Sequence, residues 1–199
     1  MTIPDRSFFQ RSNVTKVAAD LLGKMLISDI GGQRTVGIIV ETEAYSWKER
    51  GCHAYQNQIT PRNSTMFREG GILYVYLCYG IHSMLNIVTG KEGEAEAVLI
   101  RALEPVKGMQ VMMGRMKVNK EKRITSGPGK LTKALGITTA YDQTDLFGKK
   151  SILRVEDGGL NISKKKIIAA PRIGIQFAGE DALLPWRFYL KDNPWVSII

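Results

Sequence analysis

The sequence predicts an α+β fold in a single domain, residues 1–199, with a mostly antiparallel curved sheet, surrounding helices and a protruding β-hairpin. Several segments alternate with a period of two, glycine-containing turns join them, and helical patterns stand between them. A chain of 199 residues with 44% hydrophobic residues can bury one sizeable core. Because no internal repeat or linker composition divides the sequence, we expect one domain.

The first elements are a helix and a hairpin. Apolar residues recur at helical spacing after an asparagine that can cap the first turn, and a glycine follows the last of them. Two alternating segments then flank a pair of glycines, which favours a hairpin. The expected elements are a helix over residues 14–22 between Asn13 and Gly23, and strands over 24–30 and 35–45 that meet at Gly31 and Gly32.

The second strand of this hairpin carries acidic residues. Side chains alternate between the two faces of a strand, so Glu41, Glu43 and Tyr45 are expected on one face. Val40 and Thr42 are expected on the other face. A carboxylate close to an apolar core is unfavourable unless it is paired or used in chemistry.

A second hairpin follows an irregular segment, residues 46–71, that contains His53. Its strands should place Tyr74, Tyr76 and Asn86 on one shared face. Tyr79 stays at the tip, where we expect an exposed ring on a rigid support. The predicted strands are 73–78 and 82–88, joined by Tyr79, Gly80 and Ile81.

The second half of the chain begins with an apolar strand that contains Arg101. A methionine-rich helix should follow and contribute core side chains, then a lysine-rich loop and a second, glycine-closed helix. Short strands and turns complete the chain. The expected elements are a strand over 97–103, a helix from Glu104 and Pro105 that contains Met109, Met112, Met113 and Met116, a loop over 117–125, and a helix capped by Ser126 and closed by Gly136.

Arg101 and Glu43 are expected to form either a catalytic pair or a structural ion pair. An arginine inside an apolar strand is seldom unpaired, and Glu43 is its most useful partner. Together they could hold a water molecule that the carboxylate activates, which contributes roughly 10²–10⁴-fold to a rate. A buried ion pair with a structural role alone is the alternative, and the pattern leaves both open.

The tyrosines favour recognition of a flat ring. Electron-rich rings stack on cationic or electron-poor rings, and an alkylated purine is such a ring. A base reaches a protein pocket only by leaving the duplex, often with a side chain in the space it vacates, and Tyr79 is suitably placed.

Composition restricts the partners. A formal net charge of +9 favours an anionic partner, and nucleic acid is the leading candidate. Two cysteines, Cys52 and Cys78, provide no disulfide framework, and no apolar segment indicates a signal peptide or membrane span. We therefore expect a protein that is not secreted and has no membrane partner. Two histidines and no C-x-x-C motif make a zinc site improbable.

Several blocks resemble one known family. They are VETEAY from Val40, TPRN from Thr60, LYVYLCYG from Leu73 with the later Asn86, LIRALEP from Leu99, SGPGKL from Ser126, AGE from Ala178 and PWVS from Pro194. In this order they closely resemble the alkyladenine (3-methyladenine) DNA glycosylase family, over nearly the whole chain. The resemblance implies a base-excision repair enzyme that flips alkylated or deaminated purines out of duplex DNA and hydrolyses the N-glycosidic bond.

The resemblance also implies roles for individual residues. Glu43 would be the general base that activates water, and Arg101 would help to hold that water. The other implied positions form the base pocket and its entrance: Tyr45 stacked on one face of the base, His53 and Tyr76 on the other, the His53 backbone amide at the base edge, Asn86 excluding the exocyclic amine of guanine, and Tyr79 in the minor groove.

The expected enzyme is monofunctional, because its base is a carboxylate and no lysine stands in a pocket motif. It would need no metal and no organic cofactor. Its partner would be double-stranded DNA containing damaged purines, and we expect a monomer, in the cytoplasm (nucleoid) of a bacterium or the nucleus of a eukaryote.

Two other functions are compatible with parts of the pattern. A non-catalytic nucleic-acid-binding protein would use the tyrosines for stacking but leaves the acids unexplained. A metal-dependent nuclease would use Glu41 and Glu43 as metal ligands. In the glycosylase hypothesis, Glu41 has a structural role, paired with a nearby basic group.

Overall fold

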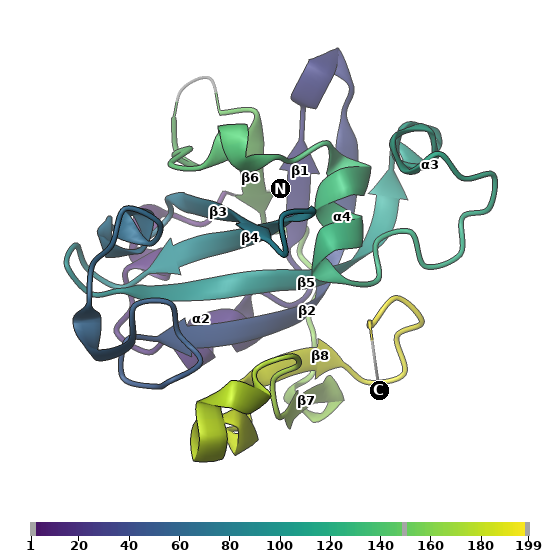
Figure 1. Ribbon diagram of the computed structural model, residues 1–199. Helices are drawn as coiled ribbons and strands as arrows, with labels where there is room; N and C mark the ends of the chain where they lie inside the picture. The colour runs from purple at the N-terminus through teal and green to yellow at the C-terminus, as the bar shows by residue number, and fades with distance from the viewer. Residues whose placement is uncertain (1–2, 149–150, 198–199) are drawn as a thin grey trace.

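The computed structural model describes residues 3–148 and 151–197, and within them one antiparallel sheet of eight strands forms the centre of the molecule (Figure 1). Six strands lie in the order β3-β4-β5-β2-β1-β6, while β8 pairs with β2 and β7 pairs with β8. The strands are β1 (Met25–Ser28), β2 (Thr35–Ser46), β3 (Leu73–Cys78), β4 (His82–Thr89), β5 (Glu96–Lys107), β6 (Leu153–Glu156), β7 (Ile167–Ala170) and β8 (Arg187–Leu190). The predicted α+β class with a curved antiparallel sheet is confirmed.

Helices are few and short, and local signals mark the start of one of them and the end of another. The Asn13 side chain accepts a hydrogen bond from the Lys16 amide at 3.0 Å, and Gly136, with φ of 78°, closes α4. The helices are α1 (Arg6–Phe9), α2 (Val14–Asp20), α3 (Met109–Met116) and α4 (Pro128–Leu135), with 3₁₀ turns η1 (Ile30–Gly32), η2 (Tyr55–Asn57), η3 (Ser64–Phe67), η4 (Thr139–Tyr141), η5 (Lys164–Lys166) and η6 (Gln176–Leu183). The first helix ends at Asp20, before the expected Leu22, in a turn that reaches Gly23.

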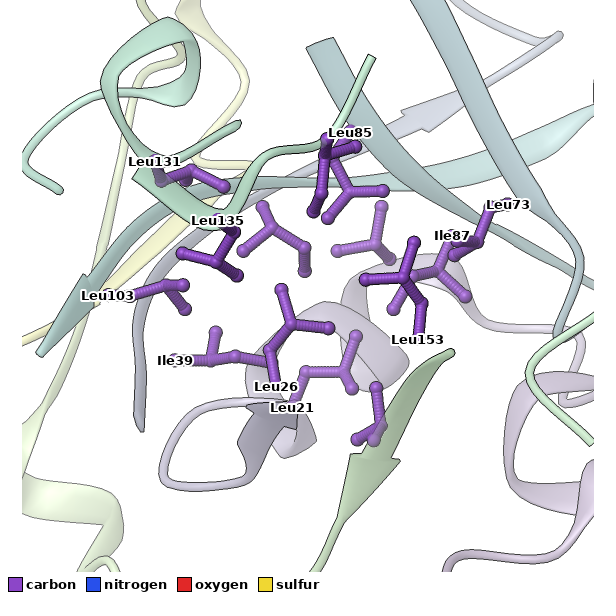
Figure 2. Packing of buried hydrophobic residues seen from close by; sticks show 14 of the residues in the cluster. Leu21, Leu26, Ile39, Leu73, Leu85, Ile87, Leu103, Leu131, Leu135 and Leu153 are labelled. Atoms are coloured by element: carbon purple, nitrogen blue, oxygen red, sulfur yellow. The ribbon is translucent and has the colours of Figure 1, made fainter. Parts of the chain in front are cut away.

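The main core fills the space between the sheet, α2 and α4 (Figure 2). Leucine and isoleucine side chains from strands and helices meet there, among them Leu21, Leu26, Leu85 and Leu135. Met112 is fully buried, and the other three methionines predicted for this helix pack against the same core. The prediction that these methionines are core residues is therefore confirmed.

Strand β2 changes its partners halfway along. Its first half pairs with β1 and its second half with β8, while β5 runs beside both halves with register shifts around Glu41. This bulge disturbs the simple alternation. Ile39 and Ala44 face the main core and Thr42 bonds to α2, but Val40 packs with Val196, beside the partners of Glu41. The expected placement of Val40 opposite Glu41 is wrong because of the bulge.

Two predicted helix starts are also wrong. Glu104 and Pro105 continue β5, and α3 begins only after Gly108, because a register irregularity at Gly37 accommodates a proline that has no amide to donate. Ser126 does not cap α4. Its backbone forms a β-bridge with Ala102, and Gly127 takes the cap position.

No helix in the described ranges, 3–148 and 151–197, has the length and apolar character needed to cross a membrane.

Candidate active site

Strand β2 brings two acids into the interior. Glu41 and Glu43 each have 0% of their surface exposed, and the bulge lies at this point of the strand. A carboxylate removed from water must be satisfied by hydrogen bonds or by opposite charge. The two carboxylates have different hydrogen-bond donors, and the number of donors determines which carboxylate can accept a further proton donor.

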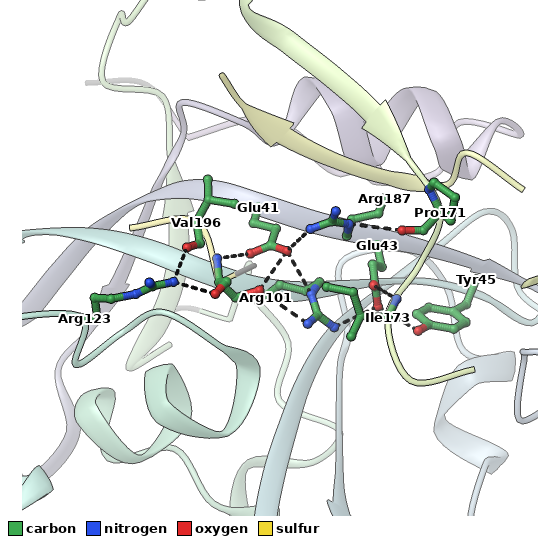
Figure 3. Close-up of polar contacts among 10 residues, drawn as sticks. Glu41, Glu43, Tyr45, Arg101, Arg123, Pro171, Ile173, Arg187 and Val196 are labelled. Carbon is green, nitrogen blue, oxygen red and sulfur yellow. Dashed lines mark hydrogen bonds and ion pairs between the residues drawn. The ribbon is translucent and has the colours of Figure 1, made fainter. Parts of the chain in front are cut away.

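Glu43 accepts three hydrogen bonds from described residues (Figure 3). The Tyr45 hydroxyl donates to its Oε2 at 2.8 Å, and Arg101 Nη1 donates to the same oxygen at 3.1 Å. The backbone amide of Ile173 donates to Oε1 at 2.7 Å. An ionised carboxylate offers about four acceptor positions, so one position of Glu43 remains for a further donor.

Glu41 is more fully occupied, with four donors among the described residues. Its Oε1 accepts from Arg101 Nε at 3.1 Å, Arg187 Nη1 at 3.0 Å and Ser197 Oγ at 2.9 Å. Its Oε2 accepts from the Ser197 amide at 2.8 Å. The expectation that Glu41 pairs with a basic group is confirmed.

Arg101 lies between the two carboxylates. It is 6% exposed, and although burial disfavours its charge, Glu43 and Glu41 more than offset this and raise its pKa. The guanidinium therefore occupies the position that a metal ion would need between two carboxylate ligands. In the described parts of the chain, no three His, Cys, Asp or Glu side chains gather as a metal site.

A cavity of about 460 Å³ opens beside this network. Such a volume is within the range that small-molecule sites occupy. Glu43 is not at its surface, but all three of its partners, Tyr45, Arg101 and Ile173, line the cavity, so the carboxylate lies directly behind the wall. The other residues of the predicted site are also found in the lining: His53, Tyr76, Tyr79 and Asn86.

Aromatic rings form one wall. His53 and Tyr76 meet edge to face with ring centroids 4.6 Å apart, and Tyr74 lies 5.3 Å from Tyr76. His53 Nδ1 is 3.0 Å from the Tyr74 hydroxyl. Burial lowers the pKa of the His53 imidazole from its ordinary value, and the charge of Arg62 lowers it further, so the neutral ring is favoured and Tyr74 can donate to Nδ1.

Tyr45 lines the cavity from β2. Burial first, and then the negative charge of Glu43, raise the pKa of Tyr45 well above 10, so its hydroxyl is a donor. The Arg172 guanidinium lies 4.7 Å from the ring centroid, paired with both oxygens of the buried Glu49 at 2.7 Å. One face of the ring is thus covered, which leaves only the other for a ligand.

The turn that carries His53 is held by side chains. Asn63 Nδ2 donates to the carbonyl oxygens of His53 at 2.8 Å and Gln58 at 2.9 Å. Among residues 3–148 and 151–197, nothing accepts a hydrogen bond from the His53 amide. On the hairpin, Asn86 is buried and donates to Tyr74 O at 3.2 Å.

Tyr79 projects from the tip of the β3-β4 hairpin, 88% exposed. The Ile81 amide donates to Cys78 O at 3.1 Å, and the residues between have positive φ, 50° for Tyr79 and 69° for Gly80. This geometry fits the strand twist, but a non-glycine residue in it is strained by about 1–2 kcal/mol. The expected connection and its exposed ring are confirmed.

Among the described residues, sequence reasoning missed five contributors to the site. Arg172 covers a face of Tyr45, the Ile173 amide holds Glu43, and Arg187 and Ser197 hold Glu41. Phe177, 75% exposed, lines the cavity with Tyr79. These residues are more than a hundred positions from β2 along the chain, and no periodicity connects them. Ser197 is part of the PWVS block that resembles the family, but the resemblance implied no role for it.

Comparisons with known proteins agree with one another. The family model "Methylpurine-DNA glycosylase (MPG)" matches residues 7–194. A protein of Methanocella arvoryzae is 47% identical over 99% of this chain and 96% of its own, and one of Natranaerobius thermophilus is 43% identical over 98% of each. A third, from Carboxydothermus hydrogenoformans, is 46% identical over 99% of each. All three have the name "Putative 3-methyladenine DNA glycosylase".

We predict that His53 titrates below 6.5, because its surroundings favour the neutral ring. Replacing Tyr74 with phenylalanine removes the donor to Nδ1 and should move the midpoint upward. Nuclear magnetic resonance titration of the imidazole measures the midpoint in the unchanged protein and in Tyr74→Phe, and the His53→Gln variant assigns the signal. A midpoint at or above 6.5 in the unchanged protein would contradict the prediction.

Proposed function

The chain belongs to the methylpurine-DNA glycosylase family and is a DNA glycosylase of base-excision repair, and we propose that it hydrolyses the N-glycosidic bond of alkylated and deaminated purines with water as the nucleophile. The observation that carries this proposal is Glu43, buried behind an aromatic cavity with one acceptor position that none of the described residues fills.

Glu43 suits the part of general base. Its three donors fix its orientation and leave one position for a water molecule, whereas Glu41 is held by four donors. Arg101 borders both Glu43 and the cavity, so it can hold the same water. The difference in occupancy supports Glu43 as the base and Glu41 as an anchor.

The reaction balances without a cofactor. The water oxygen bonds to C1′ while its proton passes to Glu43, and the electrons of the C1′–N bond leave with the base. The sugar develops oxocarbenium character, as in glycoside cleavage. An alkylated purine that is already cationic becomes neutral as it leaves. A deaminated purine is neutral and must gain one proton on leaving, and the proton that water gives up to Glu43 balances this gain in the overall hydrolysis. Because no lysine forms a Schiff base in this scheme, the DNA strand remains intact.

The cavity walls suit a flat ring. Tyr45 offers one free face, because Arg172 covers the other, while His53 and Tyr76 provide rings for the second side of the base. Rings attract a cationic purine, and a neutral His53 adds no repelling charge. We assign the unoccupied amide of His53 to the base edge and Asn86 to exclusion of the guanine amine.

The proposed partner is double-stranded DNA that contains a damaged purine. The protein would bind it as a monomer, in the compartment that holds the genome. We assign Tyr79 to the space that the flipped nucleotide leaves. Its exposure and its place at the cavity margin support this, as does the net charge of +9, which attracts a polyanion.

The test is release of free base from duplex oligonucleotides that contain an alkylated purine, hypoxanthine or ethenoadenine, with a chelator present. Glu43→Gln should retain lesion binding but lose base release by about 10²–10⁴-fold, because an amide cannot take the water proton. Chromatography measures the base, and Glu92→Gln, at an exposed position, is the matched control. Strand cuts that require Mg²⁺ would instead indicate a nuclease, and full activity of Glu43→Gln would remove Glu43 from catalysis.

Tyr79→Ala should weaken binding to lesion duplex by about tenfold, since it removes the ring that occupies the vacated stack. A fluorescent base analogue opposite or beside the lesion reports flipping, and fluorescence anisotropy reports binding. Leu160→Ala, at another exposed apolar position outside the cavity lining, should leave both unchanged. Equal affinity and flipping in Tyr79→Ala and the unchanged protein would exclude the wedge.

A further inference from the structure

Ser197 contacts the charged network from a segment that the proposed mechanism does not use. Its amide donates to Glu41 Oε2 at 2.8 Å and its hydroxyl to Glu41 Oε1 at 2.9 Å. Arg101 Nη2 lies 3.5 Å from the same hydroxyl oxygen. We propose that Ser197 is a positioning residue that fixes Glu41, and through Glu41 the guanidinium of Arg101 that contacts Glu43. This inference rests on the proposed function.

The orientation of Arg101 needs such support. Its guanidinium directs Nε to Glu41, Nη1 to Glu43 and Nη2 to Ser197, so each nitrogen has a different partner. A guanidinium also binds both oxygens of one carboxylate readily. Glu41 and Glu43 are equally buried and both lie within reach of Arg101. A further contact, to Ser197, holds the guanidinium in the orientation in which it bonds to both acids and not to Glu41 alone.

Ser197 is well suited to be that anchor. Its hydroxyl can accept from Arg101 while it donates to Glu41, and because Arg101 also donates to Glu41, the three polar groups form a closed ring. Among the described residues, the other charged groups at the network are Arg187, bonded to Glu41, and Arg172, whose charge interacts with that of Glu43. Arg123 also lies there and donates to the carbonyl oxygens of Val196 at 3.0 Å and Ser197 at 2.5 Å.

Arg123 also links the positioning segment to the basic loop. It belongs to the lysine-rich stretch 117–125 and has φ of 58°, a strained value for a residue with a side chain. Its two bonds to main-chain oxygens hold the end of the described chain over Glu41. Ser197 is therefore held by Arg123 at its carbonyl oxygen and by Glu41 at its amide and hydroxyl. A residue that positions other groups must itself be held in place.

The experiment compares Ser197→Ala with Ser197→Thr in single-turnover base release as a function of pH. Alanine keeps the backbone amide but loses the hydroxyl, so Glu41 competes more strongly for Arg101 and Glu43 loses its cationic donor. We expect the maximal rate to fall about tenfold and the acid limb of the pH–rate profile to move upward by about half to one pH unit. Threonine keeps the hydroxyl and should restore both. Lesion binding should be unchanged in each variant.

Ser163→Ala is the matched control, because Ser163 is exposed and lies outside the network. If Ser197→Ala has the wild-type rate and pH profile, the proposal is overturned. It is equally overturned if the thermal midpoint falls while rate and profile do not change, since Ser197 is then structural only. Failure of the unchanged enzyme to release any damaged base would count against the proposed function, so the two failures are distinct.

Discussion

The rest of the site depends on one interaction: a buried guanidinium shared by two buried carboxylates. Glu41, Glu43 and Arg101 are each at most 6% exposed, and a buried charge without a partner is strongly destabilising. Removing one partner of a buried pair typically costs about 3–5 kcal/mol. Each element that borders the network therefore has to supply a partner. Strand β8 supplies Arg187, the segment before η6 supplies the Ile173 amide, and the C-terminal segment supplies Ser197.

The path of β2 makes this arrangement possible. Its pairing with β1 ends at Ile38 and its pairing with β8 begins at Glu41, where the register with β5 also shifts, so β8 and the segment before it reach the acids. The sheet then curls, and the β3-β4 hairpin stands beside the same cavity. A rigid sheet supplies the acids and the rings, while the irregular segment 46–71 supplies His53 under the control of Asn63. Groups needed at one point therefore come from both regular and irregular structure.

Local patterns predicted most of the elements but failed where tertiary contacts competed with them. The cap at Asn13, the glycine at the end of α4 and the tip of the hairpin depend on neighbours in the sequence, and all appear as predicted. Ser126 resembles a helix cap, but a bridge to Ala102 engages its backbone. Pro105 resembles a helix start, but the long pairing of β2 with β5 extends through it. In both cases a partner distant in sequence overrides a local preference.

The sequence by itself determined the α+β class, the pairing of Glu43 with Arg101, the tyrosine hairpin and the family resemblance, because each depends on residue type and short-range spacing. Only the tertiary structure decided which acid keeps an acceptor position that residues 3–148 and 151–197 leave unfilled, because that depends on donors from Ile173, Arg187 and Ser197, all more than a hundred residues away. The strand pattern places Glu41 and Glu43 alike. Hydrogen-bond occupancy, which no spacing encodes, makes them different.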